Sequence, residues 1–196
     1  MLRFIGFYNY TVILTYLSLI SAVVGMVLSS KGLFTAAVVC LALSGLCDAF
    51  DGTVARSKKD RTEDEKAFGI QIDSLCDVIS FGVFPAVLCF HMGMNGTIGI
   101  LCMAAYVLCA VIRLAFFNVL EAKRQHEEGG CNKVYRGLPV TSISIIFPIF
   151  YLLRFLIPET VFTTVMHGVI LLVAFLFILD FSVKKPQFDK LFAGKN

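Results

Sequence analysis

The stretch of residues 48–77, DAFDGTVARSKKDRTEDEKAFGIQIDSLCD, decides the architecture of this chain. Its middle is highly charged, whereas the sequence on both sides is strongly apolar. The whole chain of 196 residues is 58% hydrophobic and 16% charged, with a mean hydropathy of +0.82. An ordinary soluble domain is far less apolar. The composition also excludes a disordered chain, a collagen-like repeat and a disulfide-rich scaffold.

Six apolar stretches lie around this charged segment and the other polar breaks. A helix needs about 20 residues to cross roughly 30 Å of hydrocarbon, and each stretch is long enough to do so. The stretches cover approximately residues 8–30, 33–55, 67–93, 98–120, 138–157 and 161–181. We therefore predict an all-α integral membrane protein of six transmembrane helices, in which residues 1–196 form a single domain.

The placement of basic residues predicts the orientation of these helices. When each Lys or Arg is assigned to its nearer membrane face, 15 of the 17 fall on the side of the long charged loops, and Lys31 and Arg154 fall opposite. Basic residues near the ends of spans favour the cytoplasmic side. We expect both termini, and the charged end of the segment 48–77, to be cytoplasmic.

Four aspartates lie inside the predicted spans, where ionisable residues are costly and usually face a cavity or a partner. On a helix of 3.6 residues per turn, each pair shares a face with small residues. The second span carries Asp48, Asp51, Gly52 and Ala55 at i, i+3, i+4 and i+7, and the third carries Gly69, Asp73 and Asp77 at i, i+4 and i+8. A short loop makes the two helices antiparallel neighbours, so we expect the four carboxylates to converge.

Four converging carboxylates need counter-charge, since two like charges about 4 Å apart repel by roughly 4 kcal/mol at an effective dielectric of 20. Protons or cations can supply it. Hard oxygen ligands suit Mg²⁺, Mn²⁺ or Ca²⁺, and the absence of a cysteine and histidine cluster argues against zinc. Arg56 follows directly and can bind a phosphate; Lys58, Lys59, Arg61 and Lys66 lie in the adjoining loop. A two-metal site for the diphosphate of a lipid is the resulting hypothesis.

The pattern Asp48-x-x-Asp51-Gly52-x-x-Ala55-Arg56, followed by Gly69-x-x-x-Asp73-x-x-x-Asp77, resembles the signature of the CDP-alcohol phosphatidyltransferase family. All its named positions are present, although the 12 residues between Arg56 and Gly69 exceed the usual spacing. The resemblance implies that an alcohol attacks the β-phosphate of a CDP-linked lipid and that CMP leaves. It also implies a homodimer.

The same resemblance assigns a role to each residue of the signature. Asp48, Asp51, Asp73 and Asp77 would coordinate divalent metals, expected to be two Mg²⁺ or Mn²⁺ ions per site. Asp77 would also be the catalytic base for the alcohol. The CDP part would be bound by Gly52, Ala55, Arg56 and Gly69.

Three further stretches resemble the branch of this family that uses L-serine as the acceptor. They are QIDSLCDVISFG at 71–82, RLAFFNV at 113–119 and GLP at 137–139. The substrates would then be CDP-diacylglycerol and L-serine, and the products phosphatidylserine and CMP. The expected serine contacts are Ser80, Arg113, Asn118 and Arg136. We expect a prokaryotic cell (inner) membrane protein with its active site at the cytoplasmic face and no nucleic acid partner.

Two other functions fit part of the sequence. The acceptor could instead be glycerol 3-phosphate or an inositol phosphate, but a phosphorylated acceptor favours more cationic residues than Arg56 and Arg113. A carrier for divalent cations also places carboxylates between helices. Transport needs access from both faces, whereas these aspartates cluster toward one side.

Overall fold

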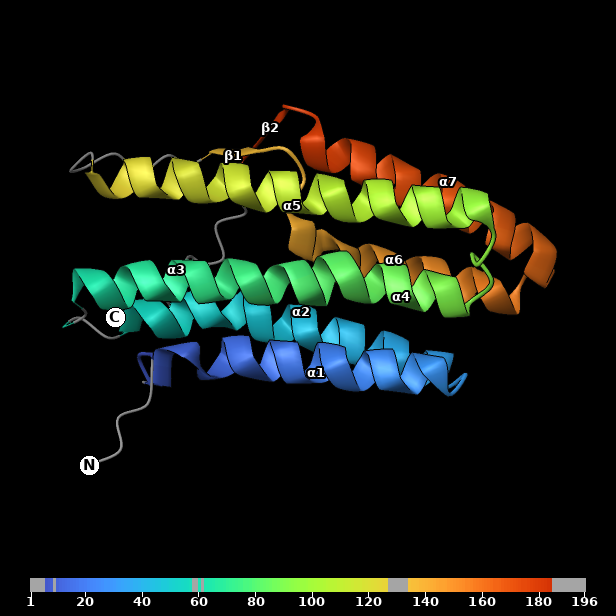
Figure 1. Ribbon diagram of the computed structural model, residues 1–196, viewed down its shortest axis with the longest axis horizontal. Helices are drawn as coiled ribbons and strands as arrows, with labels where there is room; N and C mark the ends of the chain where they lie inside the picture. Colours follow the sequence, from blue (N-terminus) through green and yellow to red (C-terminus); the bar gives the residue numbers. More distant parts are fainter. Residues whose placement is uncertain (1–5, 9, 58–59, 61, 127–133, 185–196) are drawn as a thin grey trace, which may run out of the picture.

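The computed structural model describes residues 6–8, 10–57, 60, 62–126 and 134–184. Helices run back and forth along one common direction, and the first helix begins at the same end of the bundle where the last one ends (Figure 1). The α-helices are α1 (Ile13–Ser30), α2 (Phe34–Ser57), α3 (Glu63–Asp77), α4 (Phe84–His91), α5 (Thr97–His126), α6 (Ile143–Tyr151) and α7 (Glu159–Ile178).

Five helical segments of the described chain are long and apolar enough to cross a membrane. They are Ile13–Ser30, Phe34–Gly52, Glu63–His91, Thr97–Glu121 and Glu159–Ile178, with mean hydropathies from 1.6 to 2.5. The remaining predicted stretch, 138–157, forms a shorter apolar helix over Val140–Phe155, in which the 3₁₀ turns η3 (Val140–Ser142) and η4 (Leu152–Phe155) flank α6. The prediction of a helical membrane protein is therefore confirmed, whereas the predicted count of six transmembrane helices is not.

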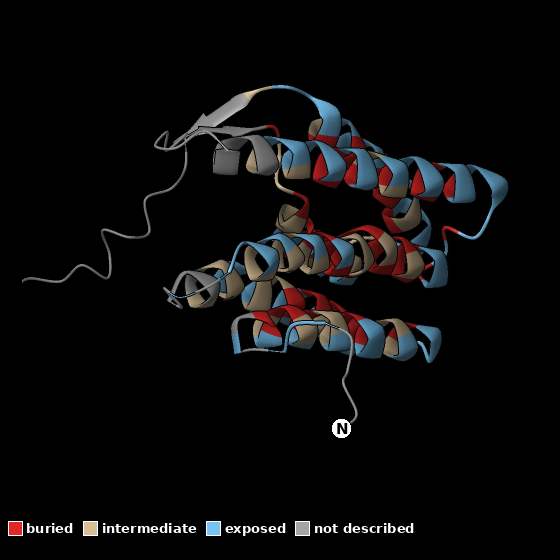
Figure 2. Ribbon diagram, turned by 60° about the vertical axis from the view of Figure 1, so that its left-hand side comes forward, coloured by how far each residue is buried: buried red, intermediate tan, exposed pale blue. Residues whose placement is uncertain are grey.

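The sides of the helices differ as expected for a protein surrounded by lipid. Buried residues lie on the faces turned toward neighbouring helices, and exposed residues face outward (Figure 2). Many of the outward residues are large and apolar, among them Leu156 at 78% exposure and Ile98 at 72%. In water an apolar surface of this extent would be a large exposed patch, whereas in a bilayer it is solvated by acyl chains.

A capping box determines where α3 begins. The Thr62 hydroxyl accepts a hydrogen bond from the Glu65 backbone N–H at 3.2 Å, and the Glu65 carboxylate accepts one from the Thr62 N–H at 3.0 Å. This arrangement satisfies N–H groups that have no partner in the first helical turn. The helix therefore starts at Glu63, four residues before the predicted start of the third stretch.

A π-helical segment, η2 (Val78–Val83), joins α3 to α4 directly after Asp77. Pro85 has no N–H to donate to the Phe81 carbonyl one turn earlier. The Tyr106 hydroxyl from α5 donates to that carbonyl instead, at 2.6 Å, and both Tyr106 and Phe81 are fully buried. This bond fixes the helix just beyond Asp77 against α5.

The two short strands were not predicted from the sequence. β1 (Val134–Arg136) pairs with β2 (Ser182–Lys184) in antiparallel register, Tyr135 lying opposite Val183. Next to the pair, the Gly137 N–H donates to the Phe181 carbonyl at 2.7 Å. The pair ties the segment before α6 to the end of α7, so the described chain is helical except at this end.

Tyr106→Phe should lower the stability of the folded protein. The substitution removes the hydrogen bond that α5 donates to the buried Phe81 carbonyl, and the net loss of such a bond costs about 0.5–1.5 kcal/mol. Thermal unfolding of the detergent-solubilised protein should show a clearly lower midpoint. Tyr151→Phe is the matched control, because Tyr151 bonds at 3.0 Å to the hydroxyl of Thr35, an exposed residue. Equal midpoints for the two variants would contradict this account of the π-helical segment.

Candidate active site

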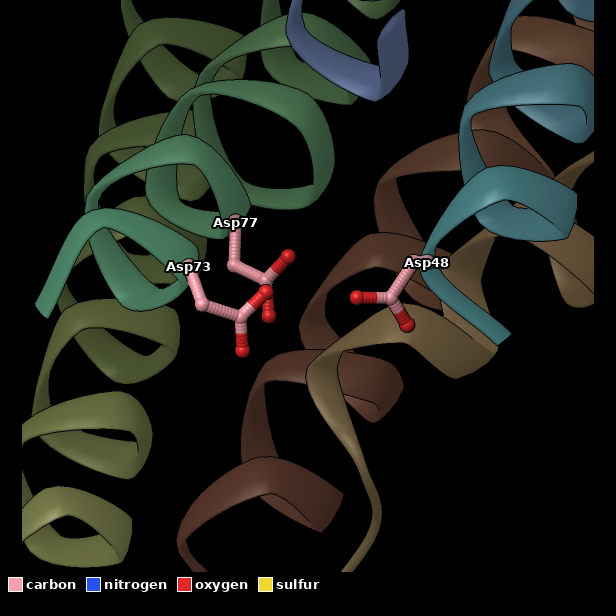
Figure 3. A group of neighbouring side chains, drawn as sticks. All are labelled: Asp48, Asp73 and Asp77. Atoms are coloured by element: carbon pink, nitrogen blue, oxygen red, sulfur yellow. The ribbon is translucent and has the colours of Figure 1, made fainter. Parts of the chain in front are cut away.

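Three carboxylates from two antiparallel helices meet at one end of the bundle. Asp48 comes from α2, and Asp73 and Asp77 lie one turn apart on α3, all facing the same space (Figure 3). One carboxylate oxygen from each residue lies within 4.8 Å of the other two. The i, i+4 spacing on α3 and the short connection to α2 bring them together, as the sequence predicted for these three.

The burial of this group makes a bound cation favourable. Asp77 is 8% exposed, and the Asp73 Oδ1 atom is buried without a hydrogen-bond partner in the described part of the chain. Leaving a buried carboxylate oxygen unpaired is costly, and like charges nearby add to the cost. A set of hard oxygen donors suits Mg²⁺ or Mn²⁺. The residues present therefore fit a divalent metal.

Asp51 is not one of the three carboxylates that all lie within 4.8 Å of one another, but it lines the same cavity beside them. Its Oδ2 atom accepts a hydrogen bond from the Thr15 hydroxyl of α1 at 3.1 Å. Asp51 follows Asp48 by three residues on α2. Three residues bring a helix to within roughly 60° of its starting direction and advance it by about 4.5 Å, so the two carboxylates leave α2 at different points. The sequence predicted that four carboxylates converge. In the structure three of them form a close group, and the fourth, Asp51, lies beside it.

The carboxylates open into a cavity of about 270 Å³. Its wall also includes the backbone of Gly52, where the absence of a side chain leaves room for a ligand. On the far side, α5 and the segment before α6 complete the cavity. The residues that line it are Asp48, Asp51, Gly52, Asp73, Asp77, Arg113, Leu114, Phe117, Pro139, Val140 and Thr141.

Arg113 supplies positive charge to this cavity. It is 7% exposed, and its Nε–H donates to the Leu138 carbonyl at 3.3 Å. Its guanidinium carbon lies 5.9 Å from the centroid of the Phe117 ring, within cation–π range. These contacts hold a buried cation across the cavity from the aspartates.

Of the other residues predicted to contact serine, neither Ser80 nor Asn118 belongs to the cavity wall. Asn118 accepts a hydrogen bond at 2.7 Å from the hydroxyl of Ser74, which joins α5 to α3. Ser80 is fully buried in η2, and its hydroxyl has no partner in the described part of the chain. Arg136 belongs to β1, and its side chain lies outside the described part.

The structure describes the surroundings of only some of the residues predicted to bind the CDP part. Gly52 lines the cavity, and Gly69 lies on α3 one turn before Asp73 but not in the cavity wall. Ala55 and Arg56 belong to the last turns of α2, and their side chains lie outside the described part. The loop residues Lys58, Lys59 and Arg61 also lie outside the described residues.

Sequence reasoning missed two hydroxyl residues at the site. Thr141 lines the cavity two residues after the GLP stretch at 137–139, so that stretch was a usable signal. Thr15 touches Asp51, but the two residues are 36 positions apart. Only the packing of α1 against α2 reveals this contact.

Comparisons of the chain with known proteins point to one family. A family model described as CDP-alcohol phosphatidyltransferase matches residues 8–180. The archaetidylserine synthase of Methanothermobacter thermautotrophicus is 33% identical over 183 residues, which cover 93% of this chain and 71% of that protein. No solved structure matches the chain.

Two other relatives match over shorter regions. The CDP-diacylglycerol–serine O-phosphatidyltransferase of Saccharomyces cerevisiae is 36% identical over 115 residues, 57% of this chain and 40% of the relative. The protein of the same name from Helicobacter pylori is 42% identical over 88 residues, 44% of this chain and 35% of the relative. For both, the match spans less than half of the relative's length. The family model matches residues 8–180, and the similarity to the archaeal protein covers 93% of the chain. The chain therefore belongs to the CDP-alcohol phosphatidyltransferase family.

Proposed function

We propose that the protein transfers the phosphatidyl group of CDP-diacylglycerol to the hydroxyl of L-serine, giving phosphatidylserine and CMP. The observation that carries this proposal is the convergence of Asp48, Asp73 and Asp77 opposite Arg113, in a chain of this family. The names of the relatives, serine phosphatidyltransferases and an archaetidylserine synthase, support serine as the acceptor. Residues 1–196 act as a single domain in this proposal.

The four aspartates hold Mg²⁺ or Mn²⁺, with two ions per site. When bound, these ions supply positive charge that neutralises the carboxylates and the diphosphate and orients the phosphorus under attack. Asp48, Asp73 and Asp77 present oxygens close enough together to share an ion. Asp51 completes the set from the same cavity wall.

The chain's own residues then carry the transfer. Asp77 accepts the proton of the serine hydroxyl, whose oxygen forms a bond to the β-phosphorus of CDP-diacylglycerol. The bond from that phosphorus to the oxygen of CMP breaks, and CMP leaves with the electron pair. Gly52 lets the nucleotide diphosphate approach the backbone of α2, while Ala55, Arg56 and Gly69 bind the rest of the CDP part.

The serine carboxylate pairs with Arg113, the member of the predicted serine set that lines the cavity. An arginine fork matches a carboxylate with two parallel hydrogen bonds. Ser80, Asn118 and Arg136 remain predicted contacts. Of these, Asn118 already serves to join α5 to α3 through Ser74.

The protein is an integral membrane protein, and we place it in the cell (inner) membrane with six crossings. Both termini and the active site are cytoplasmic in this proposal, and the protein is a homodimer. The distribution of basic residues supports the orientation, with 15 of 17 on the side of the charged loops. α2 ends and α3 begins on that same side of the bundle (Figure 1), and the carboxylates lie in the halves of the α2 and α3–α4 spans that are nearer to this side.

CMP release by the purified protein in detergent tests the function. With CDP-diacylglycerol and Mn²⁺, release should depend on L-serine and not on glycerol 3-phosphate or an inositol phosphate. Asp77→Asn should lower the rate by roughly 10²–10⁴-fold, the usual contribution of a general base. Removal of the metal with a chelator should abolish release.

Asp64→Asn is the matched control for this prediction, because Asp64 is an exposed carboxylate in the first turn of α3. It should leave the rate unchanged. Release with a phosphorylated acceptor would overturn serine as the substrate. No release with any acceptor would overturn the transferase proposal and favour a cation carrier.

Arg113→Gln should raise the KM for serine by roughly 10–100-fold, the equivalent of losing a charge-assisted hydrogen bond of about 1.5–3 kcal/mol. The KM for CDP-diacylglycerol should change much less. Arg154→Gln is the control, since Arg154 lies at the opposite end of the bundle over the Phe34 ring, 4.8 Å from its centroid. An unchanged serine KM in Arg113→Gln would remove Arg113 from the acceptor site.

A further inference from the structure

We propose that Thr15 is a positioning residue that orients Asp51 for metal binding. Thr15 lies on α1, outside the α2–α3 pair that carries the whole family signature. The inference rests on the proposed function in one respect, that Asp51 is a metal ligand. It assigns a role at the site to a helix that supplies no carboxylate to it.

The contact between the two side chains is direct and partly buried. The Thr15 hydroxyl donates to Asp51 Oδ2 at 3.1 Å, and Thr15 is only 5% exposed. A carboxylate has two oxygens, each with two lone pairs, so one hydrogen bond leaves Oδ1 able to bind an ion. Hydrogen bonds of this kind orient metal-binding carboxylates, and losing one typically weakens metal binding 10–100-fold.

Asp51 is the aspartate that Thr15 links to α1. Asp48, Asp73 and Asp77 are held close to one another by two packed helices. Asp51 lies one turn nearer the end of α2, beside that group and in the wall of the same cavity, where the like charges of the neighbouring carboxylates repel its own. The Thr15 hydrogen bond fixes one oxygen of Asp51 against α1 and so opposes this repulsion.

Thr15 is the end of a row of hydroxyl groups by which α1 bonds to α2. The Ser18 and Ser44 hydroxyls lie 2.7 Å apart, and each also donates to the other residue's carbonyl, at 3.1 and 3.0 Å. Farther into the membrane, the Ser21 hydroxyl donates to the Cys40 carbonyl at 2.9 Å. These bonds fix the rotation and depth of α1 against α2. The Ser18 and Ser44 pair, which is nearest to Thr15 in the row, therefore sets where the Thr15 hydroxyl meets Asp51.

The test measures Mn²⁺ binding to the full-length protein in detergent, without lipid or serine, by isothermal titration calorimetry. Thr15→Val keeps the shape of the side chain and removes the donor, so the Kd for Mn²⁺ should rise roughly 10–100-fold. Thr15→Ser keeps the donor and should bind Mn²⁺ close to the wild-type affinity. Ser21→Ala removes a hydrogen bond of the same row without touching a carboxylate, and it should also bind normally.

A double variant shows whether Thr15 acts through Asp51. If it does, Thr15→Val combined with Asp51→Asn should bind Mn²⁺ no more weakly than Asp51→Asn alone, since the two substitutions remove one interaction. Additive losses would overturn the inference. They would mean that Thr15 affects the metal by a route other than Asp51.

The remaining outcomes are equally decisive. Unchanged Mn²⁺ affinity in Thr15→Val would overturn the inference, and so would equal weakening in Ser21→Ala, which would show a general effect of α1 packing. A wild-type protein that binds no Mn²⁺ would overturn both the metal site and the role of Thr15. The expected Mn²⁺ result together with no CMP release for any acceptor would support the role of Thr15 and overturn the transferase proposal alone.

Discussion

Mutual repulsion among buried carboxylates is the constraint on which the rest of the structure depends. Oxygens of Asp48, Asp73 and Asp77 lie within 4.8 Å of one another at the end of a bundle of apolar helices. In such surroundings each like-charge pair costs several kcal/mol unless a cation lies between them. The helices must therefore hold the carboxylates together against their own charge. Two antiparallel helices joined by a short loop meet that need, because residues at similar distances from the loop lie side by side at the same depth.

Two neighbouring helices, α1 and α5, support this pair through hydrogen bonds. On one side, α1 bonds to α2 through hydroxyls, from Ser21 in the membrane to Thr15 at the site. On the other side, α5 bonds to α3 through Ser74 and Asn118 and to η2 through Tyr106. Hydrogen bonds between helices are well suited to lipid, where no water competes for the donors. The carboxylates are thus held in place by polar contacts that bracket them on both sides.

The two walls of the cavity carry opposite charges. Aspartates of α2 and α3 form the negative wall, and Arg113 of α5 lies opposite with its guanidinium held by the Leu138 carbonyl. A metal-bound diphosphate can be neutralised at the first wall while an amino acid carboxylate is recognised at the second. In the proposed reaction the two substrates therefore meet between sites of opposite charge. The β1–β2 pair stabilises this arrangement by tying the segment before α6, which completes the cavity, to the end of α7.

The sequence by itself determined what depends on short-range spacing. Six apolar stretches predicted the helices, and i, i+4 spacing predicted that Asp73 and Asp77 share a face, because both follow from residue type and helical period. The start of α3 at Glu63 and the strand pair were missed. Only the tertiary structure decided which distant side chains meet: that Thr15 bonds to Asp51, that Asn118 bonds to Ser74, and that Arg113 faces the aspartates. The physical reason is that such contacts depend on the rotation of each helix about its axis, which the packing of neighbouring helices sets and local sequence does not.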